Sequence, residues 1–540
     1  MKKYAYLLSF LTVSLLISCD DNNDSNDNQS LNNITITSDQ NTLNQRLDLT
    51  NAGVISLENN TATGKFAAET VSTSFPLVQI AEVKPPVDSN GKTLQASHVA
   101  VNGNYAYVSY IMRGEVYSGA IDVIDVSDPY KPKLVTSALI ANTDITSLTY
   151  SNGNLIIGAA KDIDKDASIK NPAIVINMQL SSGLLTDKYT VNALESRVTT
   201  DVAANTSSYF AVTGDQGSLF KINSSSKAIE SKATVADLRS IALSSDKVVT
   251  LSGTKGVNVY NPSTLALQKS FTTSTDVSGA KRTMDFDGTK LLVSEGANGL
   301  GVYDVNSGTK LQTIGIATAG EDNVTNAVSI NDGYAFIANG ALGLNVYQSG
   351  SQYSLLGALG IAGSTNYVKS SGNYIYVASG TGGLKIIKME KPNTTFASCT
   401  SYGTYNQGAN LILNSNEIKS YQGATSINSA IINSGAILTH CGSIAILSNL
   451  TLNSNGTFNM RGSLSQGKYM QSNPTILTIN SNATLQVEGS VVIWGDLLLN
   501  SGAKINFIGN DSSITIYGKV TKGSNVTITG TYKDTENKLK

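Results

Sequence analysis

Along most of the chain, short apolar runs alternate with polar turns, and within each run apolar and polar residues alternate with a period of two. This pattern is typical of β-strands, because successive side chains of a strand point to opposite faces of its sheet. A helical protein would instead carry apolar stripes with a period near 3.6 residues. The sequence therefore predicts an all-β protein.

Between residues 97 and 390 the same unit, a turn followed by an apolar strand, recurs seven times. The copies are NGNYAYVSY (102–110), NGNLIIGAA (152–160), TSSYFAVTG (206–214), SSDKVVTLS (244–252), DGTKLLVSE (287–295), NDGYAFIAN (331–339) and SGNYIYVAS (371–379). A second strand follows each copy, and its central residues are Ile124, Ile176, Ile222, Tyr260, Tyr303, Tyr347 and Ile387. A repeat of about 40–50 residues made of short strands is typical of four-stranded propeller blades. We therefore predict a seven-bladed β-propeller over residues 67–395.

The stretch GAIDVIDVSDPYKPKLV (119–135) adds a resemblance to this repeat. It resembles the LVIVD repeat, which is found in predicted β-propellers of bacterial surface proteins. Later copies keep a core of the form GLxVYDV but lose the DP-x-x-P turn. The resemblance implies the propeller fold and says little about activity, since propellers host many functions.

Closure of the ring yields a further prediction. The last copy ends at GLKIIKMEKP (383–392) and has no fourth strand after it. FPLVQIAEVK (75–84) precedes the first copy and is similar to the fourth strand of blade one, KLVTSALI (133–140). We expect residues 75–84 to complete blade seven, which removes two open strand edges.

After residue 405 a different repeat begins, in which short apolar runs end in Asn-Ser-Asn or Asn-Ser-Gly. The asparagines are Asn414, Asn433, Asn453, Asn480 and Asn500. Rungs of about 20 residues with tight polar corners are typical of a parallel β-helix, and stacked asparagines can hydrogen-bond along a ladder. We predict a parallel β-helix over residues 396–540, with an antiparallel β-sandwich as the alternative. Residues 47–58 resemble a stray rung and are expected to pack on the β-helix as a cap.

The N-terminus has the features of an export signal. In MKKYAYLLSFLTVSLLIS (1–18) two lysines precede an apolar run that is too short to span a membrane comfortably. Leu16 to Cys19 is similar to a bacterial lipobox, which implies a diacylglycerol on Cys19 and an outer-membrane lipid anchor. The alternative is an ordinary signal peptide with an incidental cysteine. The acidic and amide-rich residues that follow resemble the surface-export signal of Bacteroidetes lipoproteins, and we expect a disordered tether over residues 19–66.

The net charge and the cysteines limit which kinds of partner the protein can bind and which disulfide it can form. The net charge is −2 and no basic stripe is present, which argues against nucleic-acid binding. With Cys19 lipidated, Cys399 and Cys441 are the remaining pair of cysteines. They either form a disulfide or are two buried thiols too far apart to bond.

Few residues carry recognisable catalytic chemistry. The chain has two histidines and lacks a nucleophile elbow, a Walker loop and the repeated boxes of sialidases. No cofactor is expected, apart from a structural Ca²⁺ ion as a weak candidate at Asp162, Asp164 and Asp166. That loop has Ala167 where calcium loops need glycine, so a solvated insertion is the alternative.

One constellation follows from propeller geometry, in which residues just before each innermost strand surround the mouth of the channel. These candidate ligand-binding residues are His98, Ser147, Asp201, Arg239, Arg282, Asn326, Asn366 and Tyr367. Such a polar ring suits a small polar ligand, and a hydrated funnel without a ligand is the alternative.

Together these features predict a lipid-anchored, surface-exposed module for binding, adhesion or scaffolding, with an extracellular glycan or protein as partner. The alternative is a carbohydrate-active enzyme with its site at the propeller mouth. That alternative requires carboxylates that converge on the channel with perturbed pKa values.

Overall fold

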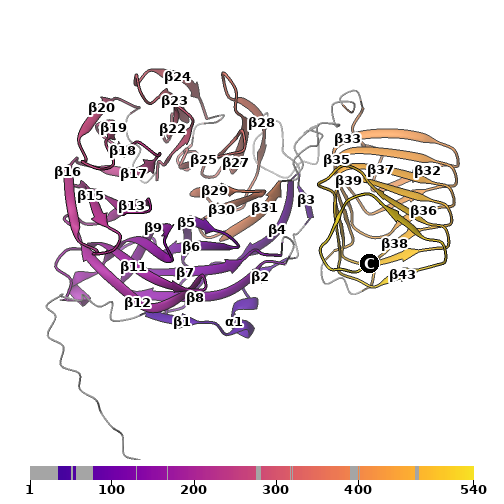
Figure 1. The fold of residues 1–540 in the computed structure, drawn as a ribbon, viewed down its shortest axis with the longest axis horizontal. Coiled ribbons are helices and arrows are strands. Elements are labelled where there is room, and N and C mark those ends of the chain that lie inside the picture. The colour runs from indigo at the N-terminus through magenta and orange to yellow at the C-terminus, as the bar shows by residue number, and fades with distance from the viewer. Residues whose placement is uncertain are drawn as a thin grey trace, which may run out of the picture.

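The computed structural model shows two all-β domains side by side, a ring of blades and a stack of parallel rungs (Figure 1). It describes residues 34–49, 53–55, 77–128, 131–166, 168–274, 281–316, 318, 320–389, 399, 402–468 and 473–539. Among these residues, no helix is long and apolar enough to cross a membrane.

The first domain is a seven-bladed β-propeller, as predicted, and each blade is an antiparallel sheet. Blades one to three consist of β5 (Gln95–Asn102), β6 (Tyr105–Ile111), β7 (Ser118–Asp125), β8 (Lys133–Ala141); β9 (Thr143–Ser151), β10 (Asn154–Lys161), β11 (Ala173–Ser181), β12 (Leu184–Ala193); β13 (Thr199–Ala204), β14 (Ser208–Thr213), β15 (Ser218–Asn223) and β16 (Ile229–Thr234). Blades four to six consist of β17 (Leu238–Leu243), β18 (Val248–Ser252), β19 (Gly256–Tyr260), β20 (Leu267–Phe271); β21 (Met284–Asp287), β22 (Lys290–Ser294), β23 (Leu300–Asp304), β24 (Lys310–Ile314); β25 (Ala327–Asn331), β26 (Tyr334–Ala338), β27 (Leu344–Gln348) and β28 (Ser354–Leu359). Buried apolar side chains of neighbouring blades pack face to face and form the core between them.

Blade seven is closed by a strand from the start of the propeller. It contains β29 (Tyr367–Ser371), β30 (Tyr374–Ala378) and β31 (Leu384–Met389), and its fourth strand is β4 (Leu77–Val83). The antiparallel register joins Leu384 to Val83 and Met389 to Leu77. The predicted closure is thus confirmed, and it ties the first strand of the ring to its last blade.

Residues 34–49 form structure outside the ring, so the prediction of a disordered tether over 19–66 is wrong for this part. β1 (Ile34–Thr37) adds a fifth strand to blade one, and α1 (Gln40–Asn44) follows it. Arg46 then forms a buried ion pair with Asp122 of blade one and donates from Nε to the Lys84 carbonyl at 2.9 Å, just after β4. This segment therefore fastens blade one to the closing strand.

The expected cap at residues 47–58 takes a different position. β2 (Leu47–Asp48) and β3 (Gly53–Ile55) pair antiparallel with β4 on the outer edge of blade seven. β3 also contacts three strands of the second domain, so it lies between the two domains instead of capping an end. The free edge of β4 explains this placement, because it offers hydrogen bonds that a cap position does not.

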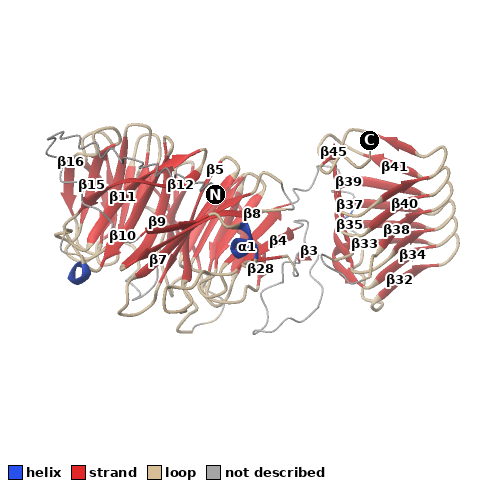
Figure 2. Cartoon of the chain, turned by 90° about the horizontal axis from the view of Figure 1, so that it is seen from below, coloured by secondary structure: helices blue, strands red, loops and turns tan. Residues whose placement is uncertain are grey.

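The second domain is a parallel β-helix of about six turns, as predicted (Figure 2). One sheet contains β32 (Asn410–Leu413), β34 (Ser429–Ile432), β36 (Leu450–Leu452), β38 (Ile476–Ile479), β40 (Asp496–Leu499) and β43 (Val520–Lys522). The other contains β33 (Ile418–Ile427), β35 (Ile437–Ile446), β37 (Thr457–Gln466), β39 (Thr484–Ile493), β41 (Lys504–Phe507), β42 (Ser513–Ile516), β44 (Thr527–Thr529) and β45 (Lys533–Asp534). Every pairing between these strands is parallel, which excludes the sandwich alternative.

Side chains repeat from rung to rung in this domain. The predicted asparagine ladder is present from Asn433 to Asn500, since Nδ2 of Asn453 donates to Oδ1 of Asn433 at 2.9 Å and Nδ2 of Asn480 donates to Oδ1 of Asn453 at 3.1 Å. A glycine column bends the long strands, and a Cβ at Gly462 would lie 2.1 Å from the Gly442 carbonyl oxygen. Cys399 and Cys441 are joined by a disulfide, which is the first of the two alternatives that the sequence leaves open.

The two domains touch through apolar and charged contacts. Val492 of β39 is buried in one cluster with Leu384 of the propeller and Leu43 of the N-terminal segment. Lys131 of the propeller pairs with Glu536 of the β-helix at 2.7 Å, and Lys388 Nζ donates to Ser490 Oγ at 3.4 Å. The domains therefore share a junction with its own packed interior.

Candidate functional site

The first strands of the blades surround the central channel, and four of them carry a bulge at the same place. The extra residues are Ser97, Thr146, Thr200 and Arg239. A bulge shifts the following residues by one position relative to the neighbouring strand. The side chains after the bulge, among them His98, Ser147 and Asp201, are therefore those that face the channel.

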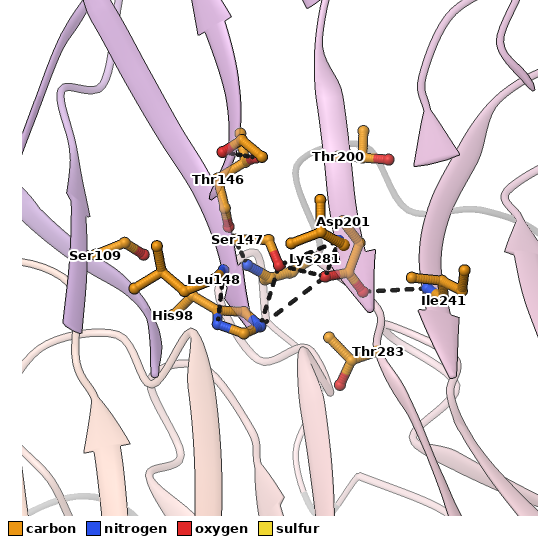
Figure 3. A network of polar contacts seen from close by, with 12 residues as sticks. His98, Ser109, Thr146, Ser147, Leu148, Thr200, Asp201, Ile241, Lys281 and Thr283 are labelled. Atoms are coloured by element: carbon orange, nitrogen blue, oxygen red, sulfur yellow. Dashed lines mark hydrogen bonds and ion pairs between the residues drawn. The ribbon is translucent and has the colours of Figure 1, made fainter. Parts of the chain in front are cut away.

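Several channel-facing side chains accept a hydrogen bond from the next blade (Figure 3). The innermost strand of each blade has an unpaired edge, and its buried N–H groups need acceptors. Nδ1 of His98 accepts from the Leu148 N–H at 3.3 Å, and Oγ of Ser147 accepts from the Val202 N–H at 3.4 Å. Oδ2 of Asp201 accepts from the Ile241 N–H at 3.1 Å, and Oγ1 of Thr283 accepts from the Val328 N–H at 3.3 Å. These polar groups thus connect the blades.

The residues one position earlier form a second set of connections, which we call the inter-blade clips. In each, a side-chain donor reaches a backbone carbonyl of the next blade. The clips are Ser97 to Ile145 at 3.2 Å, Thr146 to Thr199, Thr200 to Leu238 at 2.9 Å, Asn326 to Thr365 at 3.1 Å and Asn366 to Ala96 at 3.3 Å. Asn326 and Asn366, predicted to face a ligand, are therefore committed to clips, and the last clip spans the closure of the ring.

The two predicted arginines do not line the channel cavity. Arg282 is fully buried with a φ of 56°, and its Nε donates to the Ser294 carbonyl of its own blade at 3.1 Å. Arg239 occupies a bulge position and pairs with Asp237 at 3.0 Å. The residue that faces the channel in blade four is Ser240, so the prediction is displaced by one residue there.

Lys281, which sequence reasoning missed, crosses the channel instead. Its Nζ donates to the Thr146 carbonyl and, at 3.4 Å, to the Ser97 carbonyl, on the far side of the ring from blade five. Nζ also lies 5.3 Å from the centre of the Tyr367 ring. Burial lowers the pKa of Lys281 to about 8, and the nearby Asp201 opposes that shift. Lys281 and Arg282 are adjacent basic residues, and nothing in the sequence indicates which of the two points into the channel.

The environment of the channel favours neutral side chains. Burial lowers the pKa of His98 well below its usual value, and Lys281 and Lys369 add to this effect. The His98 ring stacks on Tyr367 with ring centres 3.8 Å apart. Burial also raises the pKa of Asp201. A cavity of about 270 Å³ remains beside these residues, and it is lined by His98, Leu148, Tyr150, Asp201, Thr283, Tyr367 and Lys369, with their strand neighbours.

The cavity offers little for acid–base catalysis. Among the described residues that line the cavity, Asp201 is the single carboxylate. Its Oδ1 accepts hydrogen bonds from the Ser147 hydroxyl and the Val202 N–H, and its Oδ2 accepts one from the Ile241 N–H. Glycoside hydrolysis needs two carboxyl groups that reach the same bond. In the β-helix, Glu488 forms an ion pair with Arg461 at 3.5 Å.

The predicted calcium loop forms a short 3-10 turn, η1 (Ile163–Lys165). Asp162 accepts from the Asp164 N–H at 3.2 Å, while Asp166 pairs with buried Lys161 at 3.4 Å. Within the described part of the chain, no group of three or more His, Cys, Asp or Glu side chains is arranged to hold a metal. The carboxylates of Asp162 and Asp166 thus have protein partners that account for their positions.

Comparisons with known proteins agree with the repeat pattern. Residues 95–139 and 362–388 match the LVIVD repeat, and they correspond to blade one and blade seven, the two blades beside the closure. No curated protein matches the chain.

Among solved structures, the WD40 β-propeller domain of Doa1 is similar with a TM-score of 0.43 and 13% identity, over 58% of this chain and 97% of that one. A chain in the crystal structure of a mitotic checkpoint complex has a TM-score of 0.43 and 11% identity, over 60% of this chain and 98% of that one. The LVIVD match and the sheet topology together show a β-propeller protein with LVIVD repeats, joined to a β-helix.

Proposed function

We propose that the protein is an exported, lipid-anchored module of the outer membrane that binds an extracellular glycan or protein, with the propeller as its rigid scaffold. The LVIVD propeller is consistent with a binding or scaffold role. The bond between Cys399 and Cys441 supports export, because structural disulfides persist mainly in oxidising compartments. Cys19, the proposed site of lipid attachment, lies outside the described residues.

The observation that carries binding over catalysis is the use of the channel side chains. Asp201 and Ser147 hold neighbouring blades together, and Lys281 reaches across the channel to the Thr146 carbonyl. A catalytic group must be free to exchange a proton or attack a substrate. Because these groups have structural partners, the propeller channel supports a scaffold better than an enzyme.

The anchor is tested by metabolic labelling with palmitate in a bacterial host that carries lipoprotein-processing enzymes. The wild-type chain should incorporate label, and Cys19→Ser should not. Cys399→Ala is the matched control, because it removes another cysteine and should keep the label. Label that persists in Cys19→Ser contradicts the anchor.

Surface display is tested separately by protease treatment of intact cells. The protein should be degraded while a soluble periplasmic protein in the same cells stays intact. Protection of both proteins until the outer membrane is opened would place this chain inside the cell envelope and contradict display.

A further inference from the structure

A groove opens where the two domains meet, and none of the predicted site residues lies in it. It has a volume of about 430 Å³. The propeller contributes Lys131, Pro132 and Lys133, the N-terminal segment contributes Leu49, and the β-helix contributes Lys468, Trp494, Tyr517 and Gly518. The site thus exists only when both domains are in place.

An aromatic pair forms one wall of this groove. Trp494 follows β39 and Tyr517 follows β42, and these strands are paired in parallel up to Ile493 and Ile516. The register places the two rings on successive rungs, where they stack with centres 4.4 Å apart and an angle of 23°. The Tyr517 N–H also donates to the Ile493 carbonyl at 2.8 Å. The backbone ladder therefore fixes this aromatic surface before any ligand arrives.

The groove is positively charged. Three lysines line it, and no carboxylate is among its described lining residues. Lys131 pairs with Glu536 at 2.7 Å and lies 4.3 Å from the centre of the Tyr517 ring. Lys133 and Lys468 are exposed and have no ion-pair partner within the described part of the chain. Two ammonium groups beside the aromatic wall are thus available to a ligand.

We propose that this groove binds an anionic polysaccharide chain that carries carboxylates, such as a chain of uronic acids. The flat apolar face of a sugar ring matches the half-buried, rigid aromatic wall of Trp494 and Tyr517, and its carboxylates match Lys133 and Lys468. A peptide strand is the weaker occupant, because β39 and β42 are already paired with neighbouring strands and present no free edge here. The inference rests on the proposed binding role and names its site and ligand class.

Trp494 is the single tryptophan of the chain, so its fluorescence reports on this groove alone. The mature chain is titrated with hexagalacturonate and, as a neutral control, with maltohexaose. Hexagalacturonate should shift or quench the emission with saturation, and maltohexaose should bind at least tenfold more weakly. Affinity should fall about tenfold between 0.1 and 1 M salt, because the Debye length shrinks from about 10 to 3 Å. An equal response to both sugars would overturn the charge argument.

Variants locate the site. Lys133→Glu and Lys468→Glu should each weaken hexagalacturonate binding about fivefold or more, as expected when an ion pair becomes a repulsion. Lys504→Glu is the matched control, since Lys504 is an exposed lysine of the β-helix, as Lys468 is, but does not line the groove. Tyr517→Ala should weaken binding about tenfold. Because that variant removes a packed ring, its melting temperature is measured in parallel.

The outcomes separate this inference from the proposed function. Equal hexagalacturonate affinity in the lysine variants and in Lys504→Glu would overturn the groove as the site while leaving a binding protein. A Trp494 response to an oligoglutamate peptide but not to hexagalacturonate would replace the glycan with a protein ligand. Failure of glycan arrays and protein pull-downs alike to yield any ligand would contradict the proposed function itself.

Discussion

Loss of the disulfide should destabilise the β-helix far more than the propeller. The bond joins Cys399, which precedes the first rung, to Cys441 on β35, and both residues are buried. It closes a loop with a sequence separation of 42 residues. The perturbation is the double variant Cys399→Ala and Cys441→Ala, which removes the bond without leaving polar groups in its place.

The expected size of the effect follows from loop closure. In the chain-entropy description, a cross-link over a loop of this length stabilises the folded state by about 4 kcal/mol at 25 °C. Unfolding a domain of roughly 145 residues changes the entropy by about 0.3 kcal/mol per kelvin at about 2.1 cal/mol/K per residue. The ratio gives a fall in the β-helix melting temperature of about 13 °C.

The assay is differential scanning calorimetry of the chain from residue 20 onward. The propeller transition is the internal control, because no cysteine of the described propeller takes part in the bond. The β-helix transition should move down by about 13 °C and the propeller transition by less than about 3 °C. A β-helix transition that stays in place would show that the cross-link does not restrict the unfolded chain enough to stabilise the folded domain.

Three further predictions concern an inter-blade clip, the asparagine ladder and the partly buried carboxyl group of Asp144. Thr200→Val removes the clip to the Leu238 carbonyl at 2.9 Å, so it should lower the free energy of unfolding in urea by about 1–2 kcal/mol. Thr289→Val, at an exposed turn, is the control and should change that free energy little. Equal effects of the two variants would contradict the clip. Asn480→Ala interrupts the ladder between Asn453 and Asn500 and should cost about 2 kcal/mol, and an unchanged β-helix melting temperature would show that the ladder contributes nothing. Burial raises the pKa of Asp144 to about 7, so its carboxyl favours folding below pH 4 and loses that contribution as the pH rises through 7. Asp144→Asn should therefore match the wild type in melting temperature at pH 4 and exceed it at pH 8; the reverse order would refute the sign.

Local sequence patterns were enough to predict the framework of both domains. Strand periodicity and the spacing of Ile124 to Ile387 define the blades, and the similarity of residues 75–84 to 133–140 identifies the closing strand. Likewise, the asparagine spacing defines the rungs, because a ladder needs the same side chain on each turn. These features are repeated, so each copy supports the others.

The channel residues were harder to predict, because they depend on register and not on repetition. The bulge at Arg239 moves the following residue, Ser240, toward the channel, and the positive φ of Arg282 leaves Lys281 to point inward. A one-residue difference reverses the face of a strand. Residues 34–49 were also missed, since their polar composition resembles a tether while their role depends on the edge of β8 and the buried Asp122.

The groove could not be predicted from sequence at all. Lys131 and Trp494 are distant along the chain and belong to different domains, so only their packing brings them together. Each residue on its own is an ordinary turn lysine or a strand-end aromatic.

A crystal structure of the mature chain with hexagalacturonate tests the central claim most directly. The account predicts a sugar ring stacked on Trp494, with its carboxylates within ion-pair distance of Lys133 and Lys468, and a propeller channel whose side chains keep their inter-blade partners. Oligosaccharide bound in the propeller channel, against His98 and Asp201 and with Lys281 displaced, would contradict both the scaffold role of the channel and the groove as the binding site.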